Sequence, residues 1–98
     1  MHTAIEQASE NQFVINGDLI FSTVGAIYEQ HKRLFENNEN AIEISFAGVQ
    51  RADSSGLALI IEWLRCAQQL DRPLVFTHVP QQIIDLAKLS SLDDLFKD

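Results

Sequence analysis

The sequence predicts an α/β fold in which three to four α-helices pack on a mixed β-sheet of about four strands. Two short strand-like runs separated by a polar turn indicate an opening hairpin. Segments with helical periodicity then alternate with short apolar runs, which implies β-α-β crossovers and parallel strand pairing. A chain of 98 residues buries about 60–70% of its unfolded surface, so we expect one domain with one core over residues 1–98.

The first elements are a hairpin and an amphipathic helix. We expect strands over Thr3–Ala8 and Gln12–Asn16, joined by the polar turn Ser9-Glu10-Asn11. The helix is predicted from Ser22 or Thr23 to Glu36 and is followed by the polar run 37–40. Its apolar stripe follows three- and four-residue spacing and contains Val24, Ile27, Tyr28, His31, Leu34 and Phe35.

The second half of the chain alternates strands and helices. We expect a buried strand at Ala41–Phe46, followed by the loop Ala47–Gln50 and a helix from Asp53 to about Leu70. A strand at Leu74–Thr77, a helix at Gln81–Leu89 and a short final turn or helix at Leu92–Phe96 complete the chain. Pro73 closes the long helix because the residue before a proline disfavours helical geometry. Pro80 fits the first turn of the next helix, where its missing N–H has no partner to lose.

The segment Arg51-Ala52-Asp53-Ser54-Ser55-Gly56 marks the point where a loop becomes an apolar helix. A carboxylate and two hydroxyl groups therefore lie at the positive end of a helix dipole, beside backbone N–H groups that lack helical partners. One interpretation is that Asp53, Ser54 and Ser55 cap the helix, a role worth about 0.5–2 kcal/mol. The other is that they form a switch or a contact surface.

The helix that follows carries more apolar surface than contact with one sheet requires. Its two stripes span roughly 200°, whereas a typical surface helix has a stripe of about 100°. The stripes are Leu57, Ile60, Ile61 and Leu64, and Leu59, Trp63, Cys66 and Leu70. Either a neighbouring helix of the same domain covers the second stripe, or part of it, around Leu59 and Trp63, reaches a partner protein.

Composition narrows the class of partner. The content of 46% hydrophobic and 21% charged residues is typical of a globular protein. The formal charge of −7 argues against nucleic acid or anionic lipid and favours a protein with basic patches. The chain has neither a secretory signal nor an apolar run long enough to span a membrane, so we expect a soluble protein. The single cysteine, Cys66, suits a reducing cytosol and a packing role.

Catalytic and metal-binding patterns are poorly represented. The sequence has no GxxxxGK phosphate loop, and its four glycines stand far apart. Its three histidines are scattered rather than spaced as metal ligands, and none is close in sequence to Ser54 as a general base. We therefore expect no enzyme activity, no cofactor and no metal. Spatial proximity of a histidine to Ser54 is the arrangement that hydrolase chemistry would require.

The tetrad Asp53-Ser54-Ser55-Gly56, placed between the strand-like AIEISF and the helical GLALIIEWLRCAQQL, resembles the motif of the STAS domain family. The resemblance covers nearly the whole chain and implies one STAS domain over residues 1–98. Family members act as anti-sigma-factor antagonists, as tails of anion transporters and as accessory subunits of lipid-transport ABC systems.

The flanking residues most resemble the cytoplasmic STAS subunits of phospholipid-transport ABC transporters. The similarity lies at Ala58, in the run Glu62–Arg65 and in the tail Leu86–Leu92. It implies a non-catalytic regulatory subunit that binds the ABC transporter ATPase subunit, within a complex with a membrane permease, and supports outer-membrane lipid asymmetry. Such a subunit is cytoplasmic and peripheral at the inner membrane, with no direct membrane insertion and no nucleic-acid partner.

The same tetrad also fits antagonists, in which the phosphorylated residue matches Ser54. The alternative function is therefore an anti-sigma-factor antagonist regulated by phosphorylation at Ser54. A phosphate there adds about −1.5 to −2 charges at a helix N-terminus, where the dipole tolerates it, while Asp53 repels it. The residues that we expect to bind a partner or act as a switch are Arg51, Asp53, Ser54, Ser55, Leu59, Glu62 and Trp63.

Overall fold

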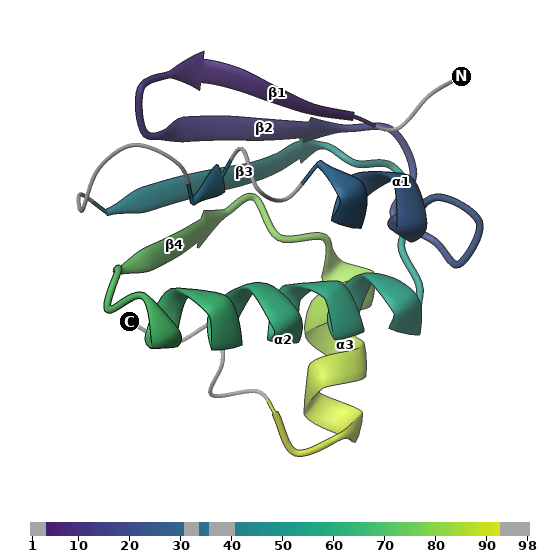
Figure 1. The fold of residues 1–98 in the computed structure, drawn as a ribbon. Helices are drawn as coiled ribbons and strands as arrows, with labels where there is room; N and C mark the ends of the chain where they lie inside the picture. The colour runs from purple at the N-terminus through teal and green to yellow at the C-terminus, as the bar shows by residue number, and fades with distance from the viewer. Residues whose placement is uncertain (1–3, 31–33, 36–40, 93–98) are drawn as a thin grey trace.

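The computed structural model describes residues 4–30, 34–35 and 41–92. These residues form a four-stranded mixed sheet in the order β1-β2-β3-β4 (Figure 1). β1 pairs with β2 in an antiparallel hairpin, and β2–β3 and β3–β4 are parallel pairs. The elements are β1 Ala4–Ser9, β2 Gln12–Asn16, α1 Val24–Glu29, β3 Ile42–Gly48, α2 Ser54–Gln69, β4 Leu74–Thr77 and α3 Gln81–Leu89. The predicted mixed α/β fold is confirmed.

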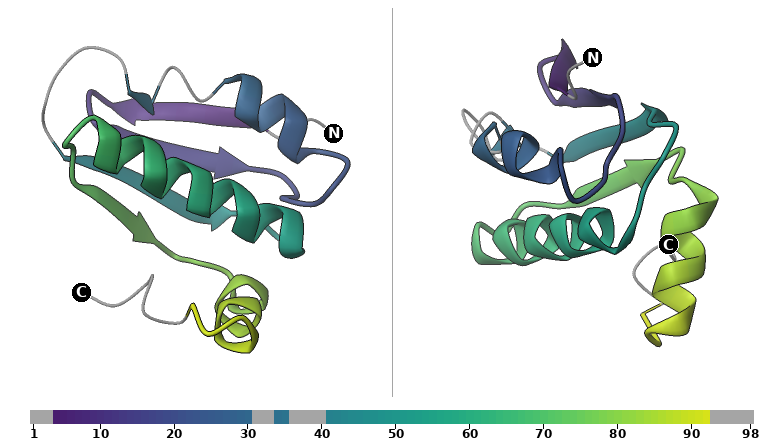
Figure 2. Two further views of the ribbon diagram at one scale, coloured as in Figure 1. Left: turned by 60° about the horizontal axis from the view of Figure 1, so that its bottom comes forward. Right: turned by 90° about the vertical axis from the view of Figure 1, so that its right-hand side faces the viewer.

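The helices cover the sheet unequally. α1 and α2 lie across one face of the sheet, whereas α3 lies beyond the β4 edge with its axis steeply inclined to α2 (Figure 2). Alternate residues of the strands face α1 and α2, because successive side chains of a strand point to opposite sides. In β3 these are Ile42, Ile44 and Phe46, which are all buried. The core therefore lies mainly between the sheet and the first two helices, and α3 adds its buried residues Ile83 and Ala87.

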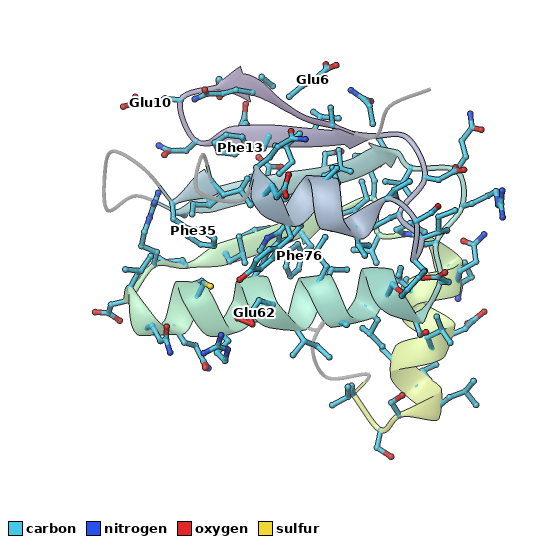
Figure 3. All side chains as sticks on the ribbon, turned by 45° about the vertical axis from the view of Figure 1, so that its right-hand side comes forward. Glu6, Glu10, Phe13, Phe35, Glu62 and Phe76 are labelled. Carbon is cyan, nitrogen blue, oxygen red and sulfur yellow. The ribbon has the colours of Figure 1, made fainter. Side chains whose placement is uncertain are left out.

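Aromatic residues contribute to this largely aliphatic core. Phe46 and Phe76 meet edge to face, with ring centroids 5.7 Å apart, an arrangement favoured by the ring quadrupoles. Phe13 is buried in the core, whereas Phe35 and Phe76 are partly buried and pack against the core residues (Figure 3). Glu6 and Glu10 are exposed on the β1–β2 hairpin, at the edge of the sheet that lies away from α2 (Figure 3).

β3 continues two residues beyond the predicted end at Phe46 because it stays paired with β2. Asn16 is the partner of Gly48, and the N–H of Gly17 donates to the carbonyl of Gly48 at 3.0 Å. A Cβ at Gly48 would lie 2.8 Å from the carbonyl oxygen of Ile15. The residues that sequence reasoning placed in a loop therefore include a glycine that lets two strands approach closely.

The first helix is shorter than predicted. α1 ends at Glu29, whereas the periodicity predicted a helix to Glu36. Gln30 supplies the physical reason: its Nε2 donates to the carbonyl of Ala26 at 3.2 Å, and its Oε1 accepts the N–H of Ile5 in β1 at 3.1 Å. A bond to the edge strand thus fixes the residue at which the helix ends. His31 and the predicted final turn beyond Leu92 lie outside the described residues.

Most of the other boundaries agree with the prediction, although β1 extends to Ser9, a residue that was expected in the turn. β2, β4 and α3 span the predicted residues, and α2 ends at Gln69 with Leu70 as its C-cap. Pro80 occupies the N-cap of α3, one position before the first turn. Across residues 4–30, 34–35 and 41–92, no helix combines the length and apolar character needed to cross a membrane.

Candidate functional site

The loop before α2 is joined to the loop after β2 by backbone hydrogen bonds. The N–H of Leu19 donates to the carbonyl of Arg51 at 2.8 Å, and the N–H of Asp53 donates to the carbonyl of Leu19 at 3.2 Å. Leu19 and Ala52 form an isolated parallel bridge that continues the β2–β3 pairing past the ends of the strands. Because the Leu19 side chain is buried, this junction is anchored in the core. Two segments more than thirty residues apart thus form one surface.

Asp53 is the N-cap of α2 and also holds the neighbouring loop. Its Oδ1 accepts the N–H of Ser55 at 2.8 Å, which satisfies one of the unpaired donors in the first turn. Its Oδ2 accepts the N–H of Phe21 at 3.1 Å. The capping interpretation is therefore confirmed for Asp53, and its carboxylate bridges two segments.

These hydrogen bonds also determine the charge of Asp53. Partial burial raises the pKa of the carboxyl group, but the donors aimed at it outweigh that effect, and the pKa lies below its ordinary value of 3.8. The donors are the backbone N–H groups of Phe21, Ser55 and Gly56 and the side chain of Ser55. The carboxylate is consequently ionised at neutral pH.

The glycine of the tetrad serves packing rather than chemistry. A Cβ at Gly56 would lie 2.9 Å from the carbonyl oxygen of Leu19 and 3.1 Å from Cδ1 of Ile83 in α3. The first turn of α2 can therefore sit against both the Leu19 loop and α3 only if this position has no side chain. Gly56 sets the position in which Ser54 and Ser55 are presented.

Ser54 and Arg51 are exposed beside the cap. Ser54 is the first residue of α2, and Ser55 next to it is partly buried. The side chain of Arg51 is 73% exposed, and its Nη1 lies 3.8 Å from Oδ2 of Asp18. Arg51 therefore meets a carboxylate of its own domain, which was the alternative to a partner contact, in an exposed pairing that contributes little to stability.

The other predicted contact residues do not share one environment. Trp63 is fully buried and Leu59 is 6% exposed, so the domain itself covers this part of the second stripe. Neither side chain is on the surface as the partner-binding prediction requires, because the sheet and core occupy that side of α2. Glu62 is partly exposed on α2 (Figure 3) and pairs with Arg65. The structure thus brings together Arg51, Asp53, Ser54 and Ser55, which we call the α2-start surface.

Sequence reasoning missed Phe21, which lies next to the α2-start surface. Its side chain is 82% exposed. Beside it is a shallow hollow of about 350 Å³, lined also by Arg51, Asp53 and Gln82 of α3. The sequence pattern gives little indication of this role, because Phe21 precedes the helical repeat that starts at Val24 and so belongs to no predicted apolar face.

Among the described residues, we find neither a histidine paired with Ser54 nor a cluster of metal ligands. His78 is the histidine that the structure describes, and its Nδ1 lies 3.4 Å from Oγ of Ser45, a different serine. Within the ranges 4–30, 34–35 and 41–92, no three His, Cys, Asp or Glu residues cluster so as to hold a metal ion. The chemistry that the α2-start surface supports is hydrogen bonding and charge contact with another molecule.

Comparison with known proteins identifies the family to which the chain belongs. A family model described as "Mlab, STAS domain" matches residues 3–97. The intermembrane phospholipid transport system binding protein MlaB of Haemophilus influenzae is 27% identical over 81 residues, which cover 80% of this chain and 77% of that protein. The chain therefore belongs to the STAS domain family and is MlaB-like.

Proposed function

We propose that this chain is a non-catalytic accessory subunit that binds the cytoplasmic ATPase of a phospholipid-transport ABC transporter and supports its activity. The proposal draws on the similarity to MlaB, whose name assigns that protein to intermembrane phospholipid transport. Through the ATPase, the chain joins a complex with a membrane permease and lies at the cytoplasmic face of the inner membrane. The complex in turn supports the lipid asymmetry of the outer membrane.

The observation that carries the proposal is the division of roles within the tetrad. Asp53 is committed to capping and Gly56 to packing, whereas Ser54 is exposed and Arg51 is 73% exposed at the same helix end. Contact groups held by a strand end and a helix start keep one geometry, which reduces the entropy lost on binding. Such a surface suits recognition of a protein rather than turnover of a substrate.

Charge supports a protein partner over nucleic acid or an anionic membrane. The chain carries a net charge of −7, and both of those ligands require clustered Lys and Arg. The ATPase surface that docks here is expected to carry basic residues, together with a carboxylate within reach of Arg51.

Co-purification tests the proposal. The tagged chain should retain the ATPase encoded beside the same permease, and Arg51→Glu should weaken that retention, because it removes a guanidinium and adds a charge that repels carboxylates. The far-ultraviolet circular dichroism of the variant should match that of the unaltered chain, since Arg51 is exposed. Failure of the unaltered chain to bind the ATPase would contradict the proposal.

A second candidate function follows from the exposure of Ser54 at the first position of α2. An anti-sigma-factor antagonist would be phosphorylated there and would lose its partner, because the phosphate adds charge beside Asp53. Mass spectrometry of the chain isolated from its own cells distinguishes the two functions: stoichiometric phosphate on Ser54, with a kinase and a sigma factor encoded nearby, favours the antagonist.

A further inference from the structure

We propose that Phe21 is the aromatic anchor of the partner interface, and that it inserts into an apolar pocket of the ATPase whose rim carries Lys or Arg. The inference rests on the proposed function and adds to it a residue outside the family tetrad. Three observations carry it: the exposure of the ring, the hydrogen bonds that hold its backbone and the shape and charge of its surroundings.

The exposure of Phe21 sets it apart from the phenylalanines of the sheet. Phe13 and Phe46 are buried in the core, whereas Phe21 is 82% exposed. Single exposed apolar side chains are common on protein surfaces, and Leu70 and Leu89 are examples in this chain. Exposure alone therefore does not make Phe21 an anchor.

The backbone at Phe21 is held by a contact with a distant segment, whereas Leu70 and Leu89 lie at the C-terminal ends of α2 and α3. The N–H of Phe21 donates to Oδ2 of Asp53 at 3.1 Å. The N–H of Ile20 donates to Oγ1 of Thr23 at 3.0 Å, and that hydroxyl donates to the carbonyl of Asp18 at 2.7 Å. The turn is further fixed by the buried side chain of Leu19. A ring on a backbone held by such contacts loses less entropy when a pocket closes around it, which favours its use as a binding anchor.

The surroundings of Phe21 indicate what it meets. The hollow of about 350 Å³ beside the ring can receive a side chain from the partner while the ring enters the partner's pocket. Asp53 accepts the N–H of Phe21, and Asp18 precedes the ring by three residues in the chain. Among the described residues that line the hollow, Arg51 is the cation, and it lies 3.8 Å from Asp18. The local excess of carboxylates matches a pocket rimmed by basic side chains and disfavours insertion into an anionic lipid surface.

Affinity for the purified ATPase tests the inference in three variants. Phe21→Ala should weaken binding at least about tenfold, as expected for removal of an anchor, and Phe21→Leu should recover part of the loss because it keeps an apolar side chain. Leu70→Ala is the matched control: it removes an exposed apolar side chain at the opposite end of α2 and should leave affinity unchanged. Because Phe21 and Leu70 are both exposed, all three variants should unfold within a few degrees of the unaltered chain.

The outcomes separate this inference from the proposed function. If the unaltered chain does not bind the ATPase, the proposed function fails and the anchor with it. If it binds and Phe21→Ala binds equally well, the anchor alone is wrong. Co-sedimentation with vesicles of phosphatidylethanolamine and phosphatidylglycerol is the third arm: binding that depends on Phe21 would assign the ring to the membrane and overturn the inference, and absence of binding supports a protein pocket.

Discussion

The two ends of α2 are built in different ways. At the start, Asp53 and Gly56 join the helix to the loop after β2 and to α3, through residues far away in the sequence. At the end, the N–H groups of Leu70, Asp71 and Arg72 donate to carbonyls of the last turn of the same helix. The start is thus held by tertiary contacts and the end mainly by a local turn. A surface that must keep one geometry for a partner is better placed at the start.

The largest effect is expected at Gly56. A valine there would meet the carbonyl oxygen of Leu19 and the side chain of Ile83 at less than normal contact distance. Overpacking of this kind, together with the poor helix propensity of valine, should lower the free energy of unfolding by about 3 kcal/mol. Denaturant titration measures the change. A Gly56→Val variant as stable as the unaltered chain would show that α2 does not depend on this close approach.

Asp53 should show the next largest effect. Asp53→Ala removes the cap and the link to Phe21, and should cost about 1–2 kcal/mol of unfolding free energy. Asp53→Asn should cost roughly half as much, because asparagine caps helices well but offers one acceptor oxygen in place of two. Thermal unfolding of both variants separates the cap from the link; an Asp53→Asn variant as stable as the unaltered chain would mean that the Phe21 bond contributes nothing.

At the opposite end of α2, the expected change has the opposite sign. Asp71 has a left-handed backbone, with φ of 55°, directly after the C-cap of the helix. Glycine is favoured at such a position, and aspartate also faces the negative end of the helix dipole. Asp71→Gly should therefore raise the unfolding free energy by about 0.5–1 kcal/mol. A lower unfolding temperature would show that the Asp71 side chain has a role that these contacts do not reveal.

The pH dependence of the Asp53 contribution should be the smallest effect. The folded protein holds the pKa of Asp53 below 3.8, so the ionised form is the stabilising one. Its contribution is complete above the ordinary value and is lost as the pH falls through the folded-state pKa. The difference in unfolding free energy between the unaltered chain and Asp53→Asn should thus be smaller near about pH 3 than near about pH 6. A difference that grows on acidification would contradict this origin of the shift.

Sequence reasoning succeeded where the signals are local. Both ends of α2 and the start of α3 follow from the cap at Asp53 and from Pro73 and Pro80, which act within a few residues. It failed for α1, because a hydrogen bond between Gln30 and Ile5 in another element ends that helix. Periodicity reports which residues are apolar and gives no information on such a contact.

The candidate site was predictable in part for the same reason. The tetrad and Arg51 form one continuous run of residues, so they had to lie together. The burial of Leu59 and Trp63 depends on which side of α2 meets the sheet, and two apolar stripes left that choice open. Phe21 joins the site through its bond to Asp53 and through the backbone bonds of Leu19, all across more than thirty residues, which no local pattern encodes.

The most direct test of the proposed partner surface compares one substitution at the two ends of α2. Ser54→Arg and Gln69→Arg both place an arginine at an exposed position of this helix, about 22 Å apart by the helical rise. We predict that Ser54→Arg weakens binding of the ATPase at least tenfold, while Gln69→Arg stays within about twofold and neither changes the unfolding temperature by more than a few degrees. Equal affinities of the two variants, or a loss confined to Gln69→Arg, would place the partner elsewhere on the molecule.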